Sequence, residues 1–133
     1  MGRILVPFRV ASWSESSKEI RGVGMVDTGA YGMILPAVWR AALGTPPAIA
    51  VVDVELADQR VVKAEVCGPV EIQIDGFRRV LGEVIFVDMV PNARGEYEPL
   101  IGYTILEACN VVVDMTQHRL VARKYYDLKR VAA

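Results

Sequence analysis

Short runs rich in Val and Ile, separated by turn residues, make up most of this chain and constrain its fold more than any other feature. Such runs, bounded by Gly, Pro, Asp and Asn, are typical of β-strands and of the turns between them. The polar stretch 12–18 separates the first two runs, so we expect these two to pair as a hairpin. Strands are predicted over residues 4–11, 20–26, 48–56, 60–66, 70–75, 77–87, 111–115 and 119–125.

Two short helices are expected to interrupt the strands. The first is predicted over residues 36–43, because Pro36 suits the first helical turn and Gly44 suits a C-terminal cap. The second is predicted over residues 103–109, which contain the good helix formers Leu106, Glu107 and Ala108. A mainly β chain with many strands and two short helices predicts a closed or nearly closed barrel, or a sandwich.

Length and composition favour one folded domain over residues 1–133, with a core at about 3–125 and a short C-terminal tail. The chain has 133 residues, of which 53% are hydrophobic and 23% charged, enough for one core but not for two. The net charge of -1 gives no reason to expect a nucleic acid partner. No apolar run approaches the roughly 20 residues of a membrane helix, so no membrane association is expected.

The start of the chain and the cysteines favour a cytoplasmic protein. Pro7 and Arg9 interrupt the apolar N-terminal stretch, which therefore does not resemble a signal peptide. Cys67 and Cys109 lie singly in apolar segments. Buried free thiols are therefore expected at both positions in place of a disulfide.

The run Met25-Val26-Asp27-Thr28-Gly29-Ala30 is the most informative for function. An apolar strand leads directly into Asp27, and a carboxylate at the end of a buried strand is costly unless other groups hold it. Gly29 allows a tight turn that brings its N–H close to the carboxylate, and Thr28 offers a hydroxyl that could brace the loop. The pattern indicates a positioned carboxylate. An ordinary turn remains open, because Asp-(Ser/Thr)-Gly arises by chance in roughly one chain in twenty of this length.

Together with its surroundings, this run resembles the signature of the retropepsin-like aspartic proteases, the single-lobe family that includes retroviral proteases and their cellular relatives. The signature here is Met25-Val26-Asp27-Thr28-Gly29-Ala30, followed by a short helix ending near Gly44. Much later, Leu100-Ile101-Gly102 leads into the second helix, as in that family. The resemblance covers roughly residues 20–121. It implies a closed β-barrel of the retropepsin-like acid protease type and a cellular, non-viral member of the family.

The resemblance also implies roles for individual residues around the signature. Asp27 would be the catalytic acid, and Thr28 would tie the active-site loops of two chains together. Gly29 and Ala30 would line the substrate cleft. Support of the loop from behind would come from Leu100, Ile101 and Gly102.

A flap that closes over substrate is implied at the hairpin tip formed by Ala57, Asp58 and Gln59. Many relatives have a glycine-rich tip, whereas this one contains no glycine. Viral members often carry an acidic residue just after the signature and an arginine just after the second glycine. Those places are occupied here by Tyr31 and Tyr103, so that ion pair cannot form.

The implied activity is that of an aspartic endopeptidase that hydrolyses peptide bonds without a metal or cofactor. Two carboxyl groups about 3 Å apart cannot both ionise, so one acts as base towards a water molecule while the other acts as acid. The chain carries the signature once, so we expect a homodimer in which two copies of Asp27 meet on the two-fold axis. A peptide or protein substrate would lie extended between flap and cleft.

Other interpretations of the sequence stay open or are weaker. A catalytically silent retropepsin-like module for dimerisation or peptide binding would carry the same signature. Asp-x-Gly loops also bind phosphate in two-lobed ATPases, for which this chain is too short. His118 and Asp114 fit ordinary turns, and Cys109 fits a core position. One His and two distant Cys lack zinc-ligand spacing, and Gly22-x-Gly24 lacks the third glycine of a dinucleotide site.

Overall fold

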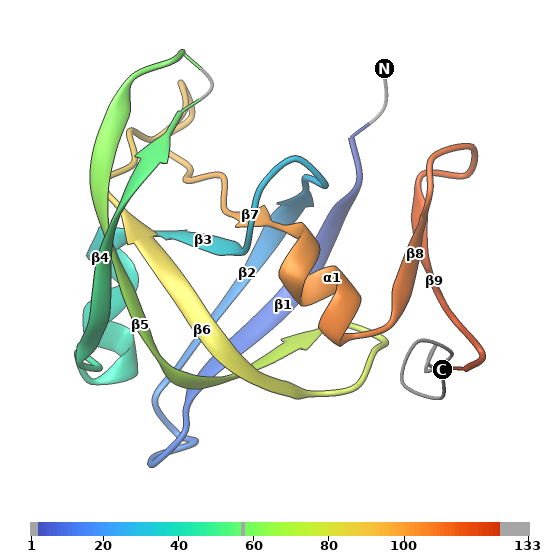
Figure 1. The fold of residues 1–133 in the computed structure, drawn as a ribbon, viewed down its shortest axis with the longest axis horizontal. Helices are drawn as coiled ribbons and strands as arrows, with labels where there is room; N and C mark the ends of the chain where they lie inside the picture. The colour runs from blue at the N-terminus through green and yellow to red at the C-terminus, as the bar shows by residue number, and fades with distance from the viewer. Residues whose placement is uncertain (1–2, 57, 126–133) are drawn as a thin grey trace, which may run out of the picture.

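The computed structural model describes residues 3–56 and 58–125 of the chain. In this part the protein is mainly β, with two short helices, as predicted (Figure 1). The 3₁₀ helix η1 and the α-helix α1 span Ala37–Leu43 and Tyr103–Ala108. The strands are β1 (Leu5–Ser12), β2 (Glu19–Val26), β3 (Met33–Pro36), β4 (Ala48–Glu55), β5 (Val61–Ile74), β6 (Val80–Val87), β7 (Leu100–Ile101), β8 (Val111–Asp114) and β9 (Arg119–Ala122).

Seven strands form one mixed sheet in the order β1-β2-β7-β3-β6-β5-β4 within the described residues. The first strand β1 also pairs with β5, so hydrogen bonds run nearly all the way around a ring. Strand β4 lies outside this ring and pairs with β5 alone. Strands β8 and β9 form a separate two-stranded sheet beside the ring (Figure 1). The predicted hairpin of the first two strands is confirmed by the antiparallel pairing of β1 with β2.

Strand β5 differs from the prediction of two separate strands over residues 60–66 and 70–75. It runs without a break through Gly68-Pro69, where the sequence indicated an interruption because proline has no N–H to donate. The register of β5 against β6 shifts between Cys67 and Val70, so Pro69 falls at an irregularity of the ladder. The first part of β5 pairs with β4 and the last part with β1. A single strand thereby joins the β4–β5 hairpin to the ring.

Other element boundaries also differ from those predicted. The short strands β3 and β7 are absent from the sequence prediction, and β6 and β9 are shorter than the predicted 77–87 and 119–125. The first helix begins at Ala37, because Pro36 is the last residue of β3 and the helix N-cap. Gly44 caps its C-terminus in the left-handed conformation, with φ of 76°, as predicted.

Two clusters of buried apolar side chains occupy opposite faces of the sheet. Strand β3 contributes Met33 and Leu35 to the larger cluster and Ile34 to the smaller one, because successive side chains of a strand point to opposite faces. Cys67 and Cys109 are buried and unpaired in the larger cluster, as predicted, and burial raises the pKa of both thiols. The smaller cluster consists of Ile34, Ala64, Val66, Ile85 and Val87.

Candidate active site

The Asp27 loop, residues 27–32, connects β2 to β3 without these two strands pairing with each other. Strand β7 lies between them, parallel to β2 and antiparallel to β3. Met25 and Val26 are in register with Leu100 and Ile101. The loop therefore leaves one side of β7 and returns along its other side, beside the β7 label in Figure 1.

Backbone hydrogen bonds tie the Asp27 loop to β7 and to the start of α1. The Asp27 N–H donates to the Ile101 carbonyl at 3.0 Å, and the Gly102 N–H donates to the Gly32 carbonyl at 3.0 Å. The Tyr103 N–H donates to the Ala30 carbonyl at 2.9 Å. These bonds lie at Asp27, Ala30 and Gly32. The backbone of the loop is therefore held from behind by a segment that lies about seventy residues later in the chain.

The Asp27 carboxylate is held by its own loop. The Gly29 N–H donates to Asp27 Oδ1 at 2.9 Å, the contact expected from the sequence, and the Ala30 N–H donates to the Asp27 carbonyl at 3.0 Å. The side chain is half-buried, and no ion pair to it is present among residues 3–56 and 58–125. Its second oxygen, Oδ2, accepts no hydrogen bond from these residues.

Gly102 makes the closest contact between the loop and the β7 segment. A Cβ atom at this position would lie 2.5 Å from the Ala30 carbonyl oxygen and 2.5 Å from the Gly32 nitrogen. Both of these are backbone atoms that cannot rotate away, so only glycine fits. The Leu100-Ile101-Gly102 element lies directly behind the Asp27 loop.

A second threonine, which the sequence analysis did not single out, braces the loop. The Thr104 hydroxyl donates to the Tyr31 carbonyl at 2.7 Å, and the Thr104 N–H donates to the same oxygen at 2.9 Å. Thr28, in contrast, is exposed, and its hydroxyl makes no hydrogen bond within the described part of the chain. The sequence signal that could have identified Thr104 is a hydroxyl residue in the first turn of the predicted helix after Gly102.

Tyr31 and Tyr103 contact each other through their aromatic rings. The Tyr31 and Tyr103 rings meet edge to face, with centroids 5.6 Å apart and an interplanar angle of 89°. Edge-to-face contacts of this kind add a modest stabilisation to the burial of the rings. The start of α1 is thereby joined to the end of the Asp27 loop through side chains as well as through the backbone.

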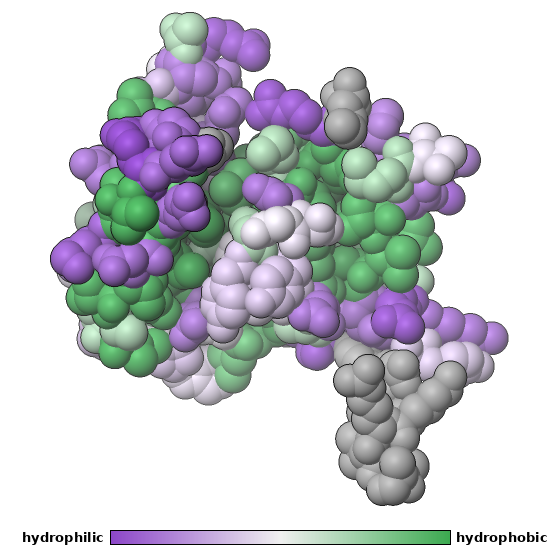
Figure 2. Space-filling model, turned by 45° about the horizontal axis from the view of Figure 1, so that its top comes forward, coloured by the Kyte–Doolittle hydropathy of each residue, from purple (hydrophilic) through white to green (hydrophobic). Residues whose placement is uncertain are grey.

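The β4–β5 hairpin and the Asp27 loop pack against the same apolar cluster. Val52, Val54 and Val62 of the hairpin are half-buried against the smaller cluster, and so are Ala30 and Leu100. Figure 2 looks towards this end of the molecule and shows hydrophobic surface, in green, recessed beside the hydrophilic hairpin tip. A partly covered apolar surface therefore runs between the hairpin and the loop.

The described residues of the hairpin tip are exposed to solvent. Asp58 and Gln59 do not pack into either cluster, whereas Ala57, the first residue of the predicted flap tip, lies outside the described residues. The Asp58 carboxylate accepts hydrogen bonds from the Arg60 Nε at 2.6 Å and from the Arg60 N–H at 3.1 Å. These bonds lower the pKa of Asp58.

The weaker candidates from the sequence lie in ordinary structural positions. His118 is exposed in the β8–β9 turn with φ of 52°. Asp114 accepts hydrogen bonds from the Gln117 and Thr116 N–H groups, each at 3.1 Å, and the Gln117 bond is the main cause of its lowered pKa. The turn interpretation is confirmed for both residues.

The part of the chain that the structure describes contains neither a cluster of metal-ligand side chains nor a membrane-spanning helix. No group of three or more His, Cys, Asp or Glu side chains there could hold a metal ion. None of the helices there is long and apolar enough to cross a membrane.

Comparisons with known proteins give no assignment. No protein-family model matches the chain, and no curated protein matches it. The function must therefore be argued from the residues and their geometry.

Proposed function

We propose that the protein is an aspartic endopeptidase with a retropepsin-like barrel, in which Asp27 of two identical chains forms the catalytic pair. The observation that carries this proposal is the attachment of the Asp27 loop to Gly102, where backbone contacts leave no space for a side chain. An ordinary turn after a strand needs no such support. A loop held this closely can keep a carboxylate in one position, which catalysis by two facing carboxyl groups requires.

The chemistry needs two carboxyl groups in different protonation states. One Asp27 takes a proton from a water molecule, which attacks the peptide carbonyl, and the other donates a proton to the developing oxyanion and later to the leaving amine. In one chain, Asp27 Oδ1 is occupied by the Gly29 N–H while Oδ2 accepts no hydrogen bond from the described residues. The signature occurs once in the chain, so in this proposal the second carboxylate is Asp27 of a partner chain.

Exposed groups beside Asp27 support a partner at this end of the molecule. Thr28 and Gly29, the two residues that follow Asp27, are exposed. Leu5 pairs with Met25 in the β1–β2 ladder, two residues from Asp27, and its side chain is 56% exposed. A second copy related by a two-fold axis would cover the loop and this apolar side chain together.

The hairpin supports a peptide as the substrate. Its half-buried valines face the smaller cluster, to which Ala30 and Leu100 beside the loop also pack. An extended peptide placed between hairpin and loop would bury apolar side chains on this surface and pair its backbone as an added strand. Movement of the hairpin tip would admit substrate and release product.

Replacement of the carboxylate tests the proposal. We expect Asp27→Asn to abolish cleavage of a peptide library, because amide and carboxyl have nearly the same shape but the amide cannot exchange the proton. The variant changes both members of the pair at once, so no second acid remains. Asp75→Asn, which alters an exposed aspartate in the β5–β6 turn, should cleave as the wild type does.

Measurements with the purified proteins should cover acidic to neutral pH, with the dimer followed by sedimentation. The wild-type kcat/KM should show a bell-shaped pH dependence, because one carboxyl must be ionised and the other protonated. Equal cleavage by wild type and Asp27→Asn would refute the mechanism. A dimer that cleaves nothing would favour a catalytically silent module for dimerisation or peptide binding, and a strict monomer at high concentration would exclude the paired site.

A further inference from the structure

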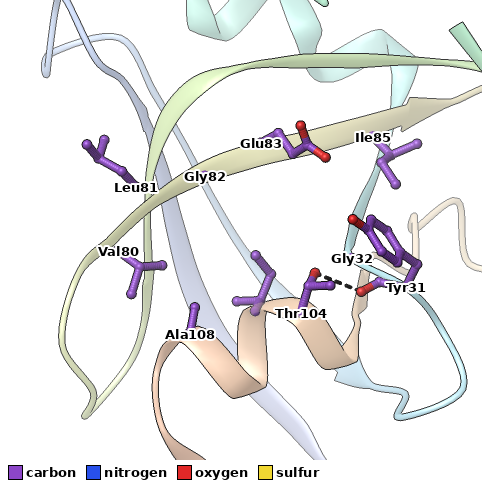
Figure 3. Close-up of a pocket in the computed structure, with 10 residues that line it drawn as sticks. Tyr31, Gly32, Val80, Leu81, Gly82, Glu83, Ile85, Thr104 and Ala108 are labelled. Atoms are coloured by element: carbon purple, nitrogen blue, oxygen red, sulfur yellow. Dashed lines mark hydrogen bonds between the residues drawn. The ribbon is translucent and has the colours of Figure 1, made fainter. Parts of the chain in front are cut away.

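A pocket of about 190 Å³ opens beside the Asp27 loop, between Tyr31, α1 and β6 (Figure 3). Its walls are mostly apolar, with Val80 and Ile85 from β6 and Ala108 from α1. The volume is below the roughly 300–1,000 Å³ typical of sites for whole small-molecule ligands. It fits a single long side chain of a larger molecule better than a complete ligand.

The pocket continues the apolar surface under the β4–β5 hairpin. Alternate residues of β6 share a face, so Glu83 and Ile85 point the same way. Ile85 belongs to the smaller cluster and also lines the pocket. Tyr31 lines the pocket from the opposite side and directly follows Ala30, which packs against the same cluster. A chain lying between hairpin and loop could therefore place one of its side chains in the pocket.

Among the residues that the structure describes, Glu83 is the only charged one that lines the pocket. Figure 3 shows its carboxylate extending from β6 towards Tyr31. Within the described part of the chain, Glu83 makes neither an ion pair nor a side-chain hydrogen bond. Opposite it, the Tyr31 side chain is 54% exposed. A carboxylate and an aromatic ring at the rim of an apolar pocket together suit a cation carried on an aliphatic stem.

We propose that this pocket is a substrate subsite that accepts a lysine or arginine side chain. The aliphatic stem lies against Val80, Ile85 and Ala108, and the charged head lies between the Glu83 carboxylate and the Tyr31 ring. Norleucine has the apolar stem without the charge, so it should bind more weakly, and glutamate should be excluded by repulsion from Glu83. The inference rests on the proposed function, because it assigns a preference to the substrate of the Asp27 site.

Binding is tested first, without proteolysis, in the Asp27→Asn protein. Nα-acetyl-lysine amide, Nα-acetyl-arginine amide and Nα-acetyl-norleucine amide are titrated while the backbone amides of Tyr31, Thr104 and Ala108 are followed by NMR. We expect the two basic probes to shift these amides at lower concentration than norleucine does. Glu83→Gln should reduce the difference by about two- to fivefold, the range of a solvent-exposed ion pair. Glu107→Gln, on the exposed side of α1, removes the same charge outside the pocket and should change nothing.

Cleavage is tested next with a random peptide library and the active enzyme. Wild type and Glu107→Gln should select a basic residue at one position relative to the cleaved bond. Glu83→Gln should lose this selection and cleave fewer peptides that carry a basic residue at that position, whereas Glu107→Gln should keep the wild-type rate. Glu83→Lys should reverse it towards acidic residues, because the charge at the rim is then positive.

The outcomes separate this inference from the proposed function. If the wild type cleaves peptides but shows no preference for basic residues that depends on Glu83, the subsite is overturned and the protease is not. Equal binding of the basic and norleucine probes overturns the subsite in the same way. Probe binding that depends on Glu83, in a protein that never cleaves a peptide, retains the subsite as a binding site and refutes the protease.

Discussion

The Asp27 loop and the tip of the β4–β5 hairpin are both turns that connect two strands, yet they are built in opposite ways. The loop donates a hydrogen bond to β7, accepts hydrogen bonds from Gly102 and α1, and contacts the buried Gly102 closely. At the hairpin tip, the described bonds join Leu56, Asp58, Gln59 and Arg60 only to one another. Stability is therefore distributed unevenly, with long-range contacts along the backbone of the Asp27 loop and local contacts at the tip. This is the arrangement expected where one part must be rigid and another must move.

Gly102→Ala should produce the largest effect, because it introduces a methyl group into the backbone contact that supports the loop. A Cβ atom 2.5 Å from backbone atoms cannot be accommodated without a shift of the Asp27 loop. We expect a loss of about 3 kcal/mol in the free energy of unfolding, the upper part of the range for overpacking. Chemical denaturation followed by circular dichroism measures it.

Gly82→Ala provides the matched control for that change. A Cβ at Gly82 would lie 3.6 Å from Ile72 Cδ1, which is an ordinary contact. This substitution should leave stability within about 0.5 kcal/mol of the wild type. Similar losses for both glycines would show that the loop contact has no special importance.

Hydrogen exchange compares the two turns directly. The amides of Asp27, Gly102 and Tyr103 are bonded to distant segments, so their exchange requires a larger opening than that of Leu56 or Gln59. We expect at least about tenfold slower exchange for the loop amides, measured by NMR after transfer to D₂O. Equal rates in the two turns would contradict the contrast between a rigid loop and a mobile tip.

The variant Thr104→Val tests how much a side chain of α1 contributes to holding the Asp27 loop. The change removes the hydroxyl that donates to the Tyr31 carbonyl but keeps the shape of the side chain. We expect a loss of about 1 kcal/mol in the free energy of unfolding, the usual contribution of one hydrogen bond.

The comparison variant is Thr28→Val, which should leave the stability of one chain unchanged and weaken the dimer, as measured by sedimentation. A dimer unaffected by Thr28→Val would exclude a role for its hydroxyl across the two-fold axis.

The smallest effect concerns the Asp58–Arg60 contact at the hairpin tip. Hydrogen bonds from Arg60 hold the pKa of Asp58 below its ordinary value of 3.8. Because the folded-state pKa is lowered, the contact contributes stability above that ordinary value, and the contribution is lost as pH falls through the lowered value. NMR titration of the carboxyl carbon should show the lowered midpoint in wild type and a return towards 3.8 in Arg60→Gln. If the midpoint of Asp58 in Arg60→Gln equals that of the wild type, a group other than the Arg60 side chain lowers the pKa of Asp58.

The strands with many Val and Ile residues were predictable because their signals are local. The runs now seen as β1, β2, β4 and β8 lie close to the predicted ranges, and α1 ends at Ala108, one residue before the predicted end. The contact of the Gly29 N–H with the Asp27 carboxylate also followed from the sequence, since both groups lie two residues apart. Each of these features depends on neighbours along the chain.

The short strands β3 and β7 could not be predicted in the same way. Leu100–Ile101 has two residues, too few for any periodicity, and becomes a strand only because β2 and β3 offer unpaired edges on both sides. The continuity of β5 through Pro69 depends likewise on a shift in its register with β6. In both cases the partner strand lies far away in the sequence.

By itself, the sequence determined a mainly β chain with two short helices and a carboxylate on a tight turn, because turn residues, β-branched runs and helix caps act over a few positions. Only the tertiary structure decided what lies behind that turn. It placed Gly102 against the Ala30 carbonyl, Thr104 under Tyr31 and the hairpin valines on the same cluster as Leu100. These contacts join segments separated by about forty to about seventy residues, and they form only when a nearly closed ring of strands brings those segments together.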